Sequence, residues 1–158
     1  MAKSLIIALM RVWFLSLCAL AGGPAICARD VPAANPPETG KPGAPPMTYP
    51  LLVERLRAAG AAVEPAGGVD QPFFSGAGKA IRIGGEDVQV FQYPTAAAAE
   101  AEARRVSRDG SAIGTAKPHW IGTPHFYRQG RLLVLYLGEE KKVLQVLEAV
   151  LGRQFAGQ

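Results

Sequence analysis

Apolar residues recur at helical spacing in three segments of the chain, and each segment predicts a helix that buries one stripe. The first segment is TYPLLVERLRAAG, residues 48–60, and its stripe comprises Tyr49, Leu52, Val53, Leu56 and Ala59. We expect Thr48 to cap the first amides of this helix. We expect Gly60 to end it, because glycine enters the left-handed backbone region without strain.

The second segment, TAAAAEAEARRVSRDG at residues 95–110, is helical by its alanine content alone. Thr95 is its expected cap, and Glu100 with Arg104 forms a supporting i, i+4 pair. The apolar side of this helix is mostly alanine, so the helix is able to lie close to a sheet. The third segment is EEKKVLQVLEAVLG at residues 139–152. Its acids lie at the N-terminal end, where the helix dipole is positive, and its apolar stripe comprises Val143, Leu144, Leu147, Val150 and Leu151.

Apolar and polar residues alternate in KAIRIGGEDVQVFQYP, residues 79–94, which predicts a β-hairpin with a Gly-Gly turn. A second hairpin is predicted in HFYRQGRLLVLYLG, residues 125–138, with its bend at Gln129 and Gly130. The run LLVLYL is too apolar for a strand with one solvent-exposed face, so it predicts a central strand. AAVEPAGGVDQPFF and SAIG are candidates for further short strands.

The order of these elements is helix, hairpin, helix, hairpin, helix (α-ββ-α-ββ-α). Consecutive hairpins favour an antiparallel sheet, and three amphipathic helices need a surface on which to bury their stripes. We therefore expect a two-layer α+β domain with about four to five strands and three helices, spanning residues 48–158.

The first 28 residues have the three-part layout of an export signal: basic residues, an apolar run and a stretch of small residues where a signal peptide would be cleaved. Arg11 interrupts the apolar run, but it becomes part of the basic region if translation begins at Met10 rather than Met1. Three outcomes stay open: free secretion or periplasmic export after cleavage, lipidation of Cys27, and an uncleaved membrane anchor. Cys27 follows PAI, which departs from a lipoprotein signal.

Residues 29–47 contain six prolines and two glycines and predict a disordered tether. Beyond it, residues 48–158 carry 13 Lys and Arg against 11 Asp and Glu, a net charge of +2, which gives little support to nucleic acid binding. Both cysteines of the chain lie within the signal. A chain that begins at Arg29 therefore has no disulfide, thiol nucleophile or thiolate metal site.

The candidate chemistry is sparse. His119 and His125 are six residues apart, which in a continuous strand separates them by about 20 Å, and two histidines alone do not complete a metal site. Ser75, Ser107 and Ser111 stand outside any G-x-S-x-G elbow. The run SGAGKA lacks the first glycine and the Ser or Thr of a phosphate-binding loop. We expect no metal and no cofactor.

The remaining candidates are aromatic and basic residues. Arginines near the end of the second helix, Arg104, Arg105 and Arg108, would form an anion-binding patch if the second hairpin's tip lay beside them; a solvated surface is the alternative. For a binding surface the candidates are Trp120, His125, Tyr127, Arg128 and Arg131. Such a surface requires Trp120 and Tyr127 to be exposed.

Three runs, GEDVQVFQYPTAAAAEAEARRVS, PHFYRQGRLLVLYLG and VLQVLEAVLG, carry a resemblance to a family. Over about Leu51 to Gly157 the chain resembles small bacterial secreted or lipoprotein-type α+β domains of unknown function. In these a V-x-V-F-x-Y strand precedes an alanine-rich helix, and a second hydrophobic strand precedes a closing helix. The resemblance implies export and a fold type, and no functional residues.

We therefore expect an exported, non-catalytic envelope or binding module whose partner is an unknown envelope protein or ligand, with the N-terminus as a possible membrane tether. One alternative is a secreted hydrolase or metal-dependent enzyme that uses His119 or His125. Another is a structural accessory protein of the cell envelope. An enzyme requires one of the histidines to lie in a cleft beside a carboxylate or a serine.

Overall fold

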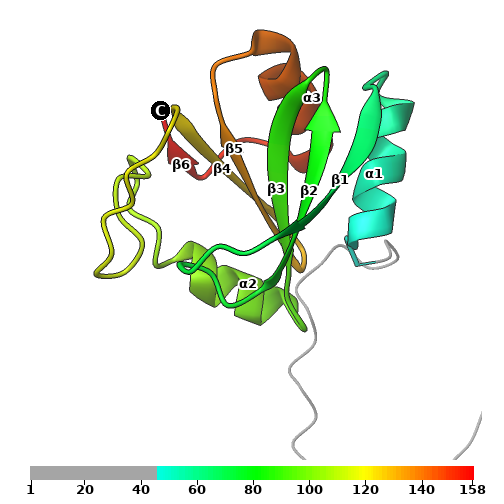
Figure 1. The fold of residues 1–158 in the computed structure, drawn as a ribbon. Helices are drawn as coiled ribbons and strands as arrows, with labels where there is room; N and C mark the ends of the chain where they lie inside the picture. Colours follow the sequence, from blue (N-terminus) through cyan, green and yellow to red (C-terminus); the bar gives the residue numbers. More distant parts are fainter. Residues whose placement is uncertain (1–45) are drawn as a thin grey trace, which may run out of the picture. The chain divides into compact units, whose positions relative to one another are not determined.

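The structure, a computed structural model, describes residues 46–158 (Figure 1). The predictions made for the export signal at residues 1–28, for Cys27 and for the tether as far as residue 45 lie outside the described residues. The described part forms an α+β domain with an antiparallel sheet, as predicted.

Six strands form one sheet in the order β1-β2-β3-β5-β4-β6, and every neighbouring pair is antiparallel. The strands are β1 (Val63–Val69), β2 (Ala77–Ile83), β3 (Glu86–Gln92), β4 (Pro124–Gln129), β5 (Leu132–Leu137) and β6 (Ala156–Gly157). The helices are α1 (Tyr49–Ala58), α2 (Ala96–Ala103) and α3 (Lys141–Leu151).

Both predicted hairpins are present. β2 and β3 are joined at Gly84 and Gly85, whose φ angles of 61° and 96° are those that a two-residue hairpin turn requires. β4 and β5 meet at Gly130, with φ of 55°. The predicted central strand is confirmed, because β5 lies between β3 and β4 and five of its six residues are buried.

The sheet is covered on both faces, so the expected two layers are in fact three. Alternate residues of β5 point to opposite sides: Leu132, Val134 and Tyr136 pack with buried residues of α1 and α3. Leu133 and Leu135 pack with α2 and with the loop that follows it. A strand as uniformly apolar as LLVLYL needs cover on both sides, which the expected two-layer arrangement did not supply.

Two strands increase the count above the predicted four to five. β1 was only a candidate strand; it has a bulge between Pro65 and Gly67, and most of its side chains are exposed. β6 has two residues, which is too short for any periodicity to reveal, and it pairs with His125 and Phe126 of β4. The SAIG segment is no regular strand, although its buried Ile113 bridges to Val106 and Ala116.

Most of the predicted helix caps and helix ends are confirmed. The Thr95 hydroxyl accepts a hydrogen bond from the amide of Ala98 at 3.1 Å, and Gly60 and Gly152 have positive φ after α1 and α3. The Thr48 side chain makes no capping bond, so that prediction was wrong. Met47, assigned to the tether by sequence, is 4% exposed and belongs to the core. Within residues 46–158, no helix has the length and hydropathy to cross a membrane.

Candidate functional site

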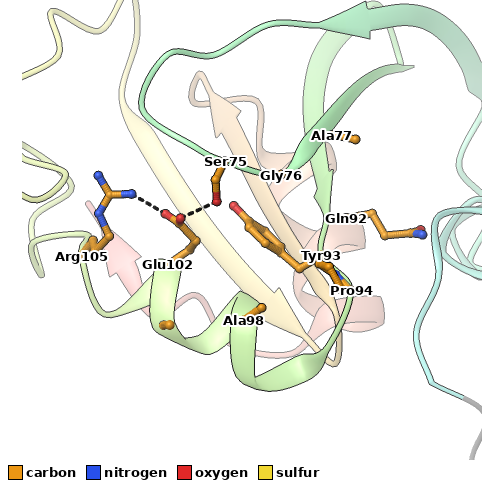
Figure 2. Close-up of a pocket in the computed structure, with 10 residues that line it drawn as sticks. Ser75, Gly76, Ala77, Gln92, Tyr93, Pro94, Ala98, Glu102 and Arg105 are labelled. Atoms are coloured by element: carbon orange, nitrogen blue, oxygen red, sulfur yellow. Dashed lines mark hydrogen bonds and ion pairs between the residues drawn. The ribbon is translucent and has the colours of Figure 1, made fainter.

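An open hollow of about 610 Å³ lies where β2 begins and β3 ends, beside α2 (Figure 2). Its apolar lining comes from Gly76, Ala77, Pro94, Ala98 and Ala101. Its polar lining comes from Ser75, Gln92, Tyr93, Glu102 and Arg105. We refer to it below as the hollow.

The hollow exists because α2 presents small side chains. Ala99 and Ala103 are buried against the sheet, while Ala98 and Ala101 stop short of the chain that leads into β2. Larger residues at these two positions would fill the space. The alanine content that the sequence showed as helical propensity thus also determines the shape of this surface.

Glu102 is the polar centre of the hollow. The Ser75 hydroxyl donates a hydrogen bond to one oxygen of its carboxylate at 2.6 Å, and the Arg105 guanidinium donates to the other at 2.7 Å. The Glu102 side chain is only 13% exposed, which makes this ion pair better shielded than an ordinary surface pair. Both carboxylate oxygens are occupied, and the charges of Glu102 and Arg105 offset each other.

Tyr93 supplies an unused hydrogen-bond donor. The residue is 4% exposed, and its ring packs against Gly76 so closely that a Cβ at position 76 would lie 2.8 Å from the ring. Its hydroxyl proton has no acceptor among residues 46–158, and the Gly76 amide offers only a donor to its oxygen. Figure 2 shows the hydroxyl pointing toward Ser75 and Glu102. A buried donor without an acceptor is costly, so this group is a candidate contact for a ligand.

The electrostatic surroundings keep this hydroxyl protonated. Burial raises the pKa of Tyr93 to about 12, and the negative charge of Glu102 acts in the same direction. The backbone amide of Gly76 and the charge of Arg105 lower the pKa by smaller amounts. Tyr93 therefore enters any complex as a neutral donor and not as a base.

The hollow has no histidine beside its serine. Within residues 46–158, the Ser75 hydroxyl bonds only to the Glu102 carboxylate, whose other oxygen is held by Arg105, and neither histidine bonds to a serine or a carboxylate. A serine nucleophile is usually activated by an adjacent histidine, and neither His119 nor His125 lines the hollow.

Trp120 and Tyr127, predicted as an exposed patch, lie on opposite sides of the sheet. The Trp120 indole donates to the carbonyl of Gly110 at 2.7 Å and meets the rings of Phe73 and Phe126 edge-on, at centroid distances of 6.0 Å and 6.1 Å. Tyr127 is 3% exposed and packs on the side of α1 and α3. Since both faces are covered, the predicted aromatic surface is not formed.

The two histidines are structurally separate. His125 is 5% exposed, stacks on Tyr136 and has its Nδ1 2.7 Å from the side-chain oxygen of Gln154. Its Nε2 has no partner in the described chain. His119 lies in an exposed loop. Residues 46–158 contain no cluster of three or more potential metal ligands, so neither histidine belongs to such a cluster.

The arginines match the solvated-surface alternative and do not form an anion-binding patch. Arg104 pairs with Glu100 at 3.3 Å and Arg105 pairs with Glu102, so two of the cations are already matched by acids of α2. Arg131 donates to the carbonyl of Pro94 at 3.2 Å, and Arg128 is exposed on β4. A bound anion would have to compete with carboxylates that are already in place.

The other two serines belong to a turn. The Asp109 carboxylate accepts hydrogen bonds from the hydroxyls of Ser107 and Ser111 at 2.6 Å and 2.9 Å, and from the amide of Ser111. These bonds lower the pKa of Asp109 to about 2. These local bonds shape the loop after α2. Of Ser75, Ser107 and Ser111, only Ser75 lines the hollow.

Sequence reasoning missed the combination of Ser75, Tyr93 and Glu102. One signal was present: Glu102 lies three residues after the buried Ala99 and so falls on the inner side of α2. A carboxylate on that side needs partners, and Arg105 was the nearest candidate in the chain. Ser75 and Tyr93 come from other elements, and no local spacing connects them with Glu102.

No protein-family model, no curated protein and no solved structure matches this chain. The resemblance to small bacterial secreted or lipoprotein-type domains therefore stays a prediction.

Proposed function

We propose that this protein is an exported, non-catalytic binding module and that its ligand occupies the hollow beside Tyr93. The observation that carries the proposal is the Tyr93 hydroxyl, which is buried, points toward Ser75 and Glu102 of the lining and has no acceptor in the described chain. A donor held in this way gains a full hydrogen bond when a ligand supplies the acceptor, because it loses little bound water on binding.

The composition of the hollow supports binding without turnover. Its walls are mostly small and apolar, with a few polar groups converging at one end, which is the usual make-up of a ligand site. The polar groups bond to one another, so they are held in fixed positions before a ligand arrives. Such preorganisation lowers the entropy cost of binding. The location outside the cytoplasm rests on the layout of residues 1–28.

A pair of variants on α2 tests the site. Ala101 lines the hollow and is exposed, whereas Ala97 is exposed on the same helix and does not line it. Ala101→Phe places a ring in the hollow without entering the core, and Ala97→Phe is the matched control. A set of small uncharged fragments would be added to the isotope-labelled full chain while its amide NMR signals are recorded.

We expect at least one fragment to shift the amide signals of Gly76, Ala98 and Glu102 at millimolar concentration, which is ordinary for fragments. The affinity should fall at least tenfold in Ala101→Phe and stay unchanged in Ala97→Phe. The proposal is overturned if no fragment shifts these signals, or if the Ala101→Phe protein binds as well as the control.

A further inference from the structure

We infer that the ligand of the hollow is an uncharged peptide segment that places the backbone C=O and N–H of one residue against Tyr93 and Ser75 and small apolar side chains against the alanines. This inference rests on the proposed function and adds the chemical class of the ligand. Three properties of the hollow support it: its unused hydrogen-bonding groups, its charge and its walls.

The unused groups are one donor and one acceptor. The Tyr93 hydroxyl has no acceptor within the described chain. Ser75 is exposed and gives its proton to Glu102, since an ionised carboxylate only accepts, so the lone pairs of the Ser75 oxygen are free to accept from a ligand. In an extended peptide the N–H and C=O of one residue point to the same side of the chain. One residue of such a peptide is therefore able to satisfy both Tyr93 and Ser75.

The charges of the hollow disfavour an anionic ligand. Arg105 is the cation closest to Tyr93 in the lining, and it is bonded to Glu102 and to the carbonyl of Phe73. A carboxylate or phosphate placed against Tyr93 would face the Glu102 charge, which already acts on the Tyr93 hydroxyl. An ammonium group has no acceptor to offer to the Tyr93 hydroxyl. A neutral acceptor bonds to the hydroxyl without facing the repulsion from Glu102.

The walls favour short aliphatic side chains over a sugar ring. Ala77, Ala98 and Ala101 line the hollow with methyl groups, and Pro94 adds a rigid apolar surface. A sugar is usually held on the open face of an aromatic ring, and the one aromatic ring here, Tyr93, is 4% exposed and packed against Gly76. The hollow is also open on one side, which allows an extended chain to continue beyond it.

The test compares three probes on the full chain by amide NMR: tri-alanine with acetylated and amidated ends, tri-alanine with free charged ends, and maltotriose. We expect the capped peptide to shift the signals of Gly76, Ala98 and Glu102. We expect the charged peptide to bind at least fivefold more weakly and maltotriose to leave these signals unchanged.

Two tyrosine variants localise the effect. Tyr93→Phe removes the donor and should weaken the capped peptide about tenfold, the loss typical of one buried hydrogen bond. Tyr127→Phe changes a tyrosine of similar burial on the opposite face and should leave the affinity unchanged. Equal affinity in wild type and Tyr93→Phe would overturn the assigned amide contact.

The outcomes separate the inference from the proposed function. If the capped peptide fails to bind while maltotriose or an uncharged fragment shifts the same signals, the hollow is a binding site and the peptide assignment is wrong. If none of the peptides, maltotriose or the fragments shifts these signals, the proposed function fails together with the inference.

Discussion

On the side of the sheet covered by α1 and α3, leucine and valine side chains fill the space between the helices and the strands. On the side covered by α2, the helix contributes alanines, and the loops before β2 and after α2 add Phe74, Val106 and Ile113 to the cover of the sheet. The interior of the first side is filled, and its open space of about 640 Å³ lies at the edge, between the end of α1, the β2–β3 turn and α3. On the second side the hollow borders Tyr93, Glu102 and Arg105.

Tyr136 and Tyr93 show the same contrast in their hydroxyl groups. The Tyr136 oxygen accepts from the amide of Glu140 at 3.1 Å and lies 3.4 Å from a carboxylate oxygen of Glu86. The Tyr93 hydroxyl proton has no acceptor in the described chain. The first side also carries an unsatisfied atom, the Nε2 of His125, whose ring stacks on Tyr136. The Tyr93 hydroxyl differs because its residue lines the hollow together with other polar side chains.

The largest effect should come from a cavity in the filled interior on the side of α1 and α3. Leu147 of α3 is fully buried, so Leu147→Ala should lower the free energy of unfolding by about 3 kcal/mol. Ala99→Gly at a fully buried position of α2 should cost only about 1 kcal/mol, chiefly through helix propensity. Urea unfolding of both variants measures the difference. Equal losses would show that the two sides are packed alike.

Smaller effects of opposite sign are expected from the two tyrosines. Tyr93→Phe removes an unsatisfied hydroxyl and should raise the free energy of unfolding by about 1 kcal/mol. Tyr136→Phe leaves the Glu140 amide without its acceptor and should lower it by about 1 kcal/mol. Thermal unfolding of the two variants gives the signs. A destabilised Tyr93→Phe protein would mean that the hydroxyl serves the fold rather than a ligand.

The smallest effect concerns alkaline pH. Burial raises the pKa values of Tyr93 and Tyr127, one on each side of the sheet, to about 12. Because the folded pKa values lie above the ordinary value of about 10, the stability linked to these groups is complete below pH 10. It is lost as pH rises from about 10 to about 12. Tyrosinate absorbance during a pH titration measures both groups.

A ligand in the hollow distinguishes these two tyrosines. A peptide carbonyl that accepts from Tyr93 favours the protonated hydroxyl, so the capped tri-alanine should raise the pKa of Tyr93 further and leave that of Tyr127 unchanged. The Tyr93→Phe and Tyr127→Phe variants assign each step of the titration. A shift of both steps, or of the Tyr127 step alone, would contradict binding at the hollow.

Local patterns predicted the three helices, the Gly84-Gly85 hairpin and the central position of LLVLYL, because periodicity, turn residues and helix caps act over a few residues. They did not predict β6, whose two residues form a strand only because β4 offers them an edge. They also did not predict that Tyr127 is buried and Trp120 partly buried on opposite sides of the sheet, which depends on elements distant in the sequence.

The sequence by itself determined the kinds of element, their order and the alanine character of α2, since each depends on propensity and spacing within one segment. Tertiary structure alone decided which side of the sheet each helix covers, and it brought Ser75 and Tyr93 to Glu102 from separate segments. The physical reason is that a hollow and an unsatisfied hydroxyl are properties of packing between segments. No residue type or local spacing encodes them until the chain has folded.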